Sequence, residues 1–449
     1  MANFDYSLEP KRDILFIDVK SFYASVECAM RGYDPLKTML VVMSTADNTG
    51  NGLILASSPM AKKVLGISNV TRANNLPNHP DLIKVPPRMN LYVQENMKIN
   101  RIFRNYVADE DWLPYSIDES VIDVTASLNL FVPNPAMSRR EKRWRLARMI
   151  QRDVFNQTGL YVTVGIGDNL LLAKLAMDNE AKHNRSLLAE WRYDDVESKV
   201  WNIPEITDFW GISERTQKRL YRLGVDTIRQ LANLSPYQQS VLFNGKTGLG
   251  AIGNQLYHHA NGIDRTILSE EAPQAKEKSY GNSQVLPKTY TSAKEIEIVV
   301  KEMAEQVASR IRRHGCLTQC VSLFIGAARG DEGSFHRQMR IPASDNTREL
   351  SKYCITLFRK HYNGFPVRHV GITYSRLLFT STRQLDLFHS PEESEKAEHL
   401  DQIIDRIREK YGFTAIVHAT SKVDGARSIK RAGLVGGHDG GGAGGLDGL

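Results

Sequence analysis

The sequence is poor in cysteine and lacks any segment suited to membrane insertion. Four cysteines occur in 449 residues, and none belongs to a CxxC pair or to a His/Cys cluster with zinc spacing. This argues against a disulfide framework or a structural zinc site, and it favours a reduced intracellular setting. The first residues lack a signal-peptide core, and no apolar run is long enough to span a bilayer. We therefore expect a cytoplasmic protein with no membrane partner.

Acidic residues are also fewer than basic ones. Lys and Arg outnumber Asp and Glu by 58 to 51, which gives a formal net charge of +7 and a pI near 9.0. A mildly basic chain favours a polyanionic partner such as nucleic acid. The length suggests about three domains, and a hydrophobic content of 41% is enough for several cores.

The first half of the chain predicts an α+β sheet domain with an insertion. Residues 35–87 differ in composition from their surroundings, with turn-rich pieces around one helix near 58–65. The longest predicted helix has a capping box of Ser138 and Glu141 and a stop at Gly159. Apolar runs and helical periodicity predict the remaining elements. The expected strands lie at 13–19 and 160–167, and the expected helices at 21–30, 90–106, 138–159 and 169–182.

The second half predicts short helices followed by a separate α+β domain. Residues 203–234 are interrupted by Gly211 and Gly224, a spacing typical of helix-hairpin-helix elements, although an ordinary helical hairpin fits as well. After a linker at 269–276, the pattern over 277–382 is β-α-β-β-α-β, the ferredoxin-like order. Basic side chains are distributed through that domain at Arg312, Arg313, Arg337, Arg340, Arg368 and Arg376.

Two local features complete this second half. The helix expected at 293–314 is predicted to begin at a capping box of Ser292 and Glu295. Residues 391–449 read as a charged helix followed by a Gly-rich tail. Such a tail has too few side chains to pack, so we expect it to be disordered.

Two adjacent carboxylates lie in PYSIDESVID (114–123), a stretch that otherwise resembles a strand. A carboxylate away from water needs a partner. Since adjacent residues on a regular strand point to opposite faces, Asp118 and Glu119 can serve one site only if the strand bends or ends there. Asp18, at the end of the apolar run 13–19, is the natural third member. Oxygen ligands suit Mg²⁺, and two such ions could activate an attacking hydroxyl and stabilise a leaving pyrophosphate.

Basic residues that could hold a triphosphate are also present. Lys62 and Lys63 lie on the predicted helix of the insertion, and Lys174 follows VTVGIGDN, although each alone would fit a solvated face. Two glycine motifs point elsewhere. GLGAIG (248–253) fits the dinucleotide pattern GxGxxG but follows no predicted strand, and NGKT (244–247) lacks the first glycine of a phosphate loop.

Four segments carry a family resemblance. They are DVKSFYASVE (18–27), SIDES (116–120), GIGDNLLLAK (165–174) and WGISERTQKRLYRLG (210–224). In this order they resemble the Y family of DNA polymerases, most closely its bacterial UmuC-like branch, and the resemblance covers about residues 12–390. It implies a multi-domain right-hand polymerase with a ferredoxin-like palm, small inserted fingers, a helical thumb and a ferredoxin-like little finger that binds DNA.

The resemblance divides the chain into named parts. The implied boundaries are palm 1–34 and 88–190, fingers 35–87, thumb 191–268, linker 269–276, little finger 277–382, clamp-binding strip 383–390, and C-terminal helix with disordered tail 391–449.

Residue roles follow from the same resemblance. Asp18, Asp118 and Glu119 would hold two Mg²⁺ ions, assisted by the Val19 carbonyl. Tyr23 would be the steric gate that stacks under the sugar and excludes a 2′-hydroxyl. Phe22 would pack beneath it, and Lys62, Lys63 and Lys174 would contact the incoming triphosphate. The implied DNA-binding residues are Gly211, Gly224, Arg312, Arg313, Arg337, Arg340 and Arg376.

The resemblance also implies partners and a biological role. The pentapeptide QLDLF resembles the segment that docks on a sliding clamp; its residues are Gln384, Leu385, Asp386, Leu387 and Phe388. The other implied partners are primer–template DNA, a deoxynucleoside triphosphate (dNTP), and a UmuD-like accessory subunit or recombinase filament. The implied activity is error-prone translesion DNA synthesis without proofreading, in DNA repair, with damage-induced expression.

Two other functions stay open at this point. A palm-domain nucleotidyl cyclase or two-metal phosphohydrolase would explain the three acids and Lys174, but not the helical hairpins or the basic ferredoxin-like domain. A non-catalytic DNA- and clamp-binding protein would explain the basic helices, but not three acids at strand ends.

Overall fold

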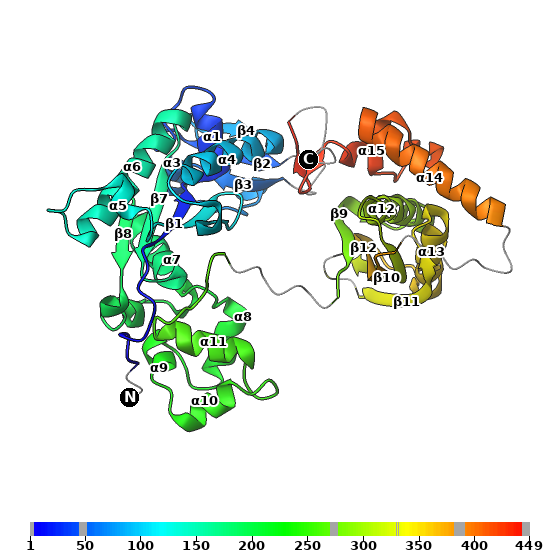
Figure 1. Ribbon diagram of the computed structural model, residues 1–449. Coiled ribbons are helices and arrows are strands. Elements are labelled where there is room, and N and C mark those ends of the chain that lie inside the picture. Colours follow the sequence, from blue (N-terminus) through cyan, green and yellow to red (C-terminus); the bar gives the residue numbers. More distant parts are fainter. Residues whose placement is uncertain are drawn as a thin grey trace. The chain divides into compact units, whose positions relative to one another are not determined.

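The computed structural model describes residues 4–44, 52–269, 277–328, 330, 332–380 and 391–441. The chain divides into two compact units, Met1–Thr38 with Val93–Ala272, and Met39–Tyr92 with Pro273–Leu449. Figure 1 shows the helices and strands of both units. Both combine helices with β-sheets, which confirms the α+β class.

A five-stranded sheet in the order β5-β6-β1-β7-β8 organises the first unit. Strand β1 lies between β6 and β7 and is antiparallel to both. Both β1 and β7 are almost entirely buried, so their sequences are continuous apolar runs that predict strands directly. The strands are β1 (Ile14–Val19), β5 (Trp112–Pro114), β6 (Glu119–Asp123), β7 (Val162–Gly167) and β8 (Leu188–Trp191).

The helices of this sheet domain begin and end largely where expected. Helix α6 (Arg139–Thr158) starts at the predicted capping box of Ser138 and Glu141, and it ends at Gly159 with a φ of 71°. Helix α7 packs on the sheet face that carries Ile14 and Phe16. The remaining helices of the domain are α1 (Phe22–Ala29), α4 (Met89–Arg104), α5 (Leu128–Phe131) and α7 (Leu170–Asn179).

A helical region follows the sheet within the first unit. Gly211 and Gly224 adopt positive φ values of 96° and 73° at the turns that flank its first helix. Buried side chains such as Leu220, Ile228 and Leu256 join the helices in one apolar core. This arrangement agrees with the short helices expected there. They are α8 (Glu214–Tyr221), α9 (Ile228–Ala232), α10 (Pro236–Leu242) and α11 (Ala251–Ala260).

The insertion contains a small sheet that the sequence did not predict. Its strand order is β3-β2-β4, and strands of three to five residues are too short to give a clear periodicity. The helix expected near 58–65 is present as α3 (Pro59–Leu65), and the Ser58 hydroxyl accepts a hydrogen bond from the Ala61 amide. The strands are β2 (Leu40–Ser44), β3 (Leu53–Ser57) and β4 (Ile83–Val85).

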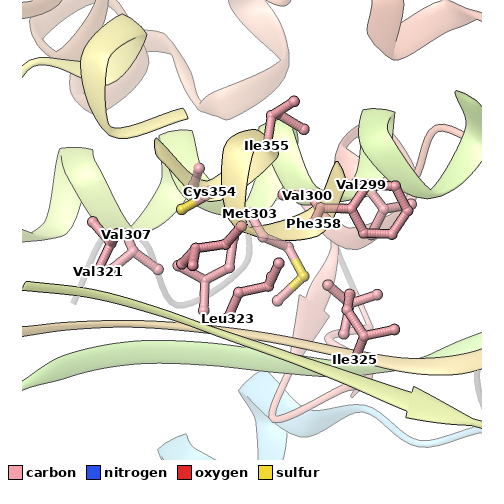
Figure 2. Packing of buried hydrophobic residues seen from close by; sticks show 14 of the residues in the cluster. Val299, Val300, Met303, Val307, Val321, Leu323, Ile325, Cys354, Ile355 and Phe358 are labelled. Carbon is pink, nitrogen blue, oxygen red and sulfur yellow. The ribbon is translucent and has the colours of Figure 1, made fainter. Parts of the chain in front are cut away.

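The C-terminal domain has the predicted β-α-β-β-α-β order. Its sheet has the order β11-β10-β12-β9, with neighbouring strands antiparallel. Helices α12 and α13 bury apolar side chains against one face, including Met303, Leu323 and Phe358 (Figure 2). The elements are β9 (Tyr280–Tyr290), α12 (Ala293–Arg313), β10 (Leu317–Ala327), β11 (Phe335–Ser344), α13 (Thr347–His361) and β12 (Val367–Leu378).

Helix α12 and the C-terminal segment each depart from expectation in one way. The capping box of Ser292 and Glu295 does not form, because the Ser292 side chain makes no cap hydrogen bond, and Glu295 packs closely against Gly425 instead. Part of the Gly-rich tail is ordered, since two short strands pair there. The elements of this segment are α14 (Pro391–Tyr411), α15 (Ser428–Arg431), β13 (Leu434–Val435) and β14 (His438–Asp439).

Short 3₁₀ helices connect several of these elements. They are Ala73–Asn75, Asp109–Asp111, Ala181–His183, Tyr193–Asp195, Val200–Asn202, Ile206–Asp208, Phe413–Ala415 and Ala419–Lys422. Over the part of the chain that the structure describes, no helix has the length and apolar content needed to cross a bilayer.

Candidate active site

The stretch PYSIDESVID forms a hairpin rather than one strand. Strand β5 ends at Pro114, β6 begins at Glu119, and the antiparallel register pairs Pro114 with Ser120. The backbone amides of Tyr115 and Ser116 both donate to the Glu119 carbonyl, at 2.9 and 3.0 Å. The first strand therefore ends before the two acids, which is the geometry that a shared site requires.

The three predicted acids lie together at one end of the sheet. Asp18 pairs with Glu119 in the register of β1 and β6. The backbone amide of Val19 donates to the Asp118 carbonyl at 2.8 Å. The Ser116 hydroxyl donates to the Asp118 carboxylate at 2.8 Å. Backbone pairing thus brings together two chain segments that are about a hundred residues apart in sequence.

Helix α7 brings Lys174 to these acids. The Lys174 Nζ lies 2.5 Å from a Glu119 carboxylate oxygen and 3.2 Å from one of Asp178. It also lies 4.6 Å from the centroid of the Phe16 ring. The Lys174 side chain is 8% exposed, so these contacts are shielded from water and are stronger than a surface ion pair.

Two glycines of β7 allow α7 to approach so closely. A Cβ atom on Gly165 would lie 2.1 Å from the Ala173 carbonyl oxygen, and one on Gly167 would lie 2.3 Å from the Ala173 amide nitrogen. Any larger residue at either position would push α7 away from the sheet. The glycines therefore allow the helix that carries Lys174 to lie close to the sheet.

Lys182 is a site residue that sequence reasoning missed. Its Nζ lies 3.4 Å from Asp18 and 2.9 Å from Asp178. Burial alone would lower the pKa of Lys182, but the Asp18 and Asp178 carboxylates outweigh burial and raise it. The available signal was the spacing Lys174–Asp178–Lys182, since residues four apart lie on one side of a helix.

Negative charge is concentrated around Asp18. Burial raises the pKa of Asp18 to about 6, and the carboxylates of Asp118 and Glu119 add to the increase, whereas Lys182 and Lys174 oppose it. A carboxylate whose ionisation is opposed by neighbouring carboxylates is stabilised by an added cation.

The donor chemistry of the cluster fits a hard divalent cation. Carboxylate oxygens are the ligands that Mg²⁺ prefers, and Mg²⁺ sites use few carboxylates because water and phosphate complete them. Among the described residues, no three His, Cys, Asp or Glu side chains are arranged so that they could hold a metal ion as they stand. Lys174 and Lys182 instead contact Glu119 and Asp18. Binding a cation therefore requires small side-chain movements.

Tyr23 and Phe22 lie next to these acids. Ser21 adopts a left-handed φ of 51° just before α1 and turns the chain at the end of β1. The Phe22 ring is buried, and its centroid lies 5.6 Å from that of Tyr23. Burial and then the Asp118 carboxylate raise the pKa of Tyr23. The charge of Asp118 therefore acts on Tyr23, while the gate role of Tyr23 stays a prediction.

Comparison with known proteins identifies the family. The model of the impB/mucB/samB family matches residues 17–178, and that of its C-terminal domain matches residues 277–387. DNA polymerase IV 2 of Bacillus subtilis (strain 168) is 32% identical over 429 residues, 95% of this chain and 98% of that protein. The chain belongs to the Y family of DNA polymerases. A member of this family is a DNA-directed DNA polymerase, which takes DNA and dNTP substrates and uses divalent metal ions.

Two further similarities agree with membership in the Y family. A Bacillus subtilis (strain 168) protein named UvrX for UV-damage repair is 38% identical over 436 residues, 97% of this chain and 99% of its own. The solved structure of a Y-family DNA polymerase chimera matches with a TM-score of 0.63 at 20% identity, over 82% of this chain and all of that one. At that identity the structural match shows the fold.

The polymerase has a groove beside the acid cluster. The groove, about 820 Å³ in volume, is lined by residues of the palm and of the helical thumb, including Asp178, His183, Trp210 and Gly211. Gly211 lines this groove together with Asp178, whereas Gly224 lies at the far end of α8. Contact of either glycine with DNA stays a prediction.

Arg312 of the polymerase's little finger is engaged within its own domain. Its guanidinium lies 2.7 Å from Asp405 and 3.3 Å from Asp401, both on α14, and donates to the Asp345 carbonyl at 2.7 Å. The Arg312 side chain is 10% exposed. These contacts argue against the predicted role in DNA binding, because a phosphate would have to displace two carboxylates.

The other arginines of the little finger lie on different surfaces. Arg340 is opposite Cys320 in the sheet and Arg337 is opposite Leu323. Because Leu323 points into the helix-covered core, Arg337 projects to that side, and Arg340 projects from the face away from the helices. The latter face also has a hollow of about 360 Å³ lined by Phe324 and other residues. Arg313 and Arg376 are exposed.

The roles of several further residues of the polymerase stay predictions. Lys62 and Lys63 lie in the last turn of α3, in the second unit, and their contact with a triphosphate stays a prediction. The Val19 carbonyl as a metal ligand also stays a prediction. The clamp-binding residues Gln384, Leu385, Asp386, Leu387 and Phe388 lie outside the described residues.

Proposed function

We propose that this polymerase extends a primer 3′ end opposite damaged template bases, without proofreading and with low fidelity. The observation that carries the proposal is the convergence of Asp18, Asp118 and Glu119 at one end of the palm sheet, with two lysines against them. Relatives named for DNA polymerase IV and for UV-damage repair support the same conclusion.

The acid cluster would hold the metal ions of the reaction. Asp18, Asp118 and Glu119, with the Val19 carbonyl, supply hard oxygen ligands next to the place of the incoming nucleotide. Two Mg²⁺ ions bound there would lower the pKa of the primer hydroxyl and stabilise the leaving pyrophosphate. The protein's contribution is mainly to position these ligands, because phosphoryl transfer depends on alignment and charge stabilisation.

The neighbouring side chains would select and hold the nucleotide. Lys174 and Lys182 present ammonium groups that can contact triphosphate oxygens. The ring of Tyr23 would stack under the sugar and leave no room for a 2′-hydroxyl, with Phe22 supporting it. Lys62 and Lys63 of the fingers are further candidates for the triphosphate, on the family resemblance.

The rest of the chain would bind DNA and tolerate damage. The described part of the fingers consists of three short strands, one α-helix and one 3₁₀ helix, and so small a subdomain would cover little of a templating base. Of the predicted DNA contacts, Arg340, Arg313 and Arg376 are exposed on the little finger, and the thumb would contribute Gly211 and Gly224 at its turns. This is the translesion arrangement expected of the UmuC-like branch.

Partners beyond DNA follow from the family resemblance. We propose that Gln384 to Phe388 dock on a sliding clamp, which would keep a weakly bound polymerase on its template. A UmuD-like accessory subunit or a recombinase filament, and damage-induced expression, are further expectations of the same branch.

Primer extension across an abasic site tests the proposed activity. The wild type should extend the primer past the lesion with Mg²⁺ and release pyrophosphate. Asp118→Ala and Glu119→Ala should reduce the rate by at least about 100-fold, the size expected on removing a preorganised charge-stabilising group. Glu110→Ala, which removes an exposed acid at the other end of the palm sheet, is the matched control and should extend normally.

The same assay separates the alternatives. A cyclase or phosphohydrolase would convert the nucleotide without lengthening the primer, and a non-catalytic binding protein would do neither. If both carboxylate variants extended primers as fast as the wild type, the assignment of these residues would be wrong.

A further inference from the structure

Asp178 contacts both lysines of the candidate active site. One of its carboxylate oxygens lies 2.9 Å from the Lys182 Nζ, and the other lies 3.2 Å from the Lys174 Nζ. Each lysine also reaches a different acid of the cluster, Glu119 for Lys174 and Asp18 for Lys182. Among these three acids, Asp178 is therefore the one that forms an ion pair with both lysines.

The local fold explains this shared contact. Asp178 lies in the last turn of α7, with Lys174 four residues before it. Lys182 follows four residues later in the 3₁₀ helix Ala181–His183, and the Lys20 ammonium donates to its carbonyl at 3.1 Å. Side chains spaced four residues apart on consecutive helical turns meet on one side. The Asp178 carboxylate consequently lies between the two lysines and contacts both.

The position of Asp178 separates it from the three acids assigned to the metal ions. Asp18 and Glu119 are on paired strands of the sheet, whereas Asp178 is on the helix that covers the sheet and also lines the groove. Cations bound to Asp18 and Glu119 would neutralise these carboxylates and weaken their attraction for the lysines. Asp178 remains as an anionic partner for both ammonium groups.

We propose that Asp178 is a positioning residue that anchors Lys174 and Lys182 so that both ammonium groups face the triphosphate of the incoming nucleotide. This inference rests on the proposed function. Lysine is a flexible side chain with a point charge, and two of them would lose considerable rotamer freedom on gripping a phosphate. An anchor that orders both in advance reduces that loss and strengthens ground-state nucleotide binding.

The test compares nucleotide binding with the rate of chemistry. Asp178→Asn should raise the dNTP Kd and KM by about tenfold, because Lys182 loses a charge-assisted hydrogen bond and Lys174 loses an ion pair. The value of kcat should change by less than about twofold, as expected for loss of ground-state binding. The Kd is measured by fluorescence titration of the enzyme on a primer that lacks a 3′-hydroxyl, so that it does not depend on turnover.

Two further variants distinguish positioning from a general charge or stability effect. Glu180→Gln removes an acid two residues away that contacts Lys199 and Trp191 rather than either site lysine, and it should leave the dNTP Kd unchanged. Asp178→Glu retains a carboxylate in reach of both lysines and should restore most of the nucleotide affinity. In a Lys182→Met background, Asp178→Asn should have a smaller effect than in the wild type, because only its contact with Lys174 remains to be lost.

Different outcomes contradict different claims. A wild type that extends primers, combined with an unchanged dNTP Kd in Asp178→Asn, would overturn this inference alone. Equal effects of Asp178→Asn and Glu180→Gln, or full additivity with Lys182→Met, would also overturn it. A wild type that fails to extend primers would contradict the proposed function instead.

Discussion

Six charged side chains lie at one end of the palm sheet, and the carboxylates among them outnumber the ammonium groups. Four carboxylates (Asp18, Asp118, Glu119 and Asp178) face two ammonium groups (Lys174 and Lys182), so an excess of two negative charges remains. Burial raises the pKa of Asp18, and the neighbouring carboxylates raise it further, because both disfavour its ionised form. A divalent cation would balance the excess negative charge of such a cluster, and a triphosphate bound to that cation would be held at the same place.

Replacing Tyr23 should change sugar selection more than activity. In Tyr23→Ala the space beneath the sugar opens, so we expect ribonucleotide incorporation to increase by at least about tenfold relative to deoxynucleotide incorporation. Single-nucleotide insertion with rNTP and dNTP measures the ratio. Tyr33→Ala, an exposed tyrosine of the same unit, is the control, and an unchanged ratio in Tyr23→Ala would remove the gate role.

At the scale of elements, local signals were predictable and tertiary ones were not. The capping box of Ser138 and Glu141 and the apolar run of β1 depend on neighbouring residues, and both were found as predicted. The role of Lys182 was missed because it depends on how the end of α7 meets β1. The capping box of Ser292 and Glu295 does not form, and Glu295 lies against Gly425, far along the chain, a contact that carries no local signal.

The close packing of α7 on β7 gives an element-level prediction. Gly167→Ala places a Cβ atom against the backbone of Ala173, which should cost about 1–3 kcal/mol of unfolding free energy as other overpacked cores do. It should also displace Lys174 from Glu119 and weaken dNTP binding. Thermal unfolding and nucleotide titration measure the two effects.

A second glycine provides the control for this prediction. Gly245→Ala meets no atom within 4 Å, so it should change neither the melting temperature nor the dNTP affinity. Wild-type stability in Gly167→Ala would show that α7 can shift without cost, contrary to the close approach described above.

The two faces of the little finger should respond differently to loss of an arginine. Arg340→Ala removes an exposed charge from the open sheet face, so DNA affinity should fall and the salt dependence of binding should decrease by about one ion. Arg312→Ala should instead lower stability by about 3–5 kcal/mol, because it leaves Asp401 and Asp405 without their partner. DNA binding at several salt concentrations and thermal unfolding distinguish them. If Arg312→Ala lowered DNA affinity without lowering stability, Arg312 would be a DNA contact after all.

At the scale of the whole molecule, the sequence predicted the order of parts better than their internal detail. The order of a sheet domain with an insertion, short helices and a β-α-β-β-α-β domain is found in the structure, because each part has its own hydrophobic periodicity. The small sheet of the insertion and the contacts of α14 with Arg312 were not predicted. Both depend on pairings between segments that carry no local signal.

Recruitment by a sliding clamp is a property of the whole chain. Deleting residues 384–388 should abolish clamp-stimulated synthesis and leave synthesis without clamp unchanged, because the pentapeptide is expected to anchor the polymerase rather than to act in chemistry. Processive primer extension with and without clamp measures this. Reordering the same five residues keeps the length and composition and serves as the control. Equal loss of both activities would indicate a structural role.

The most direct test of the central claim is a crystal structure with primer–template DNA, an incoming dNTP, a primer lacking its 3′-hydroxyl, and Mn²⁺ in place of Mg²⁺. We expect anomalous difference peaks for two ions about 2.0–2.3 Å from carboxylate oxygens of Asp18, Asp118 and Glu119 and from the triphosphate. Ions bound elsewhere, or a nucleotide that does not reach this end of the palm sheet, would contradict it.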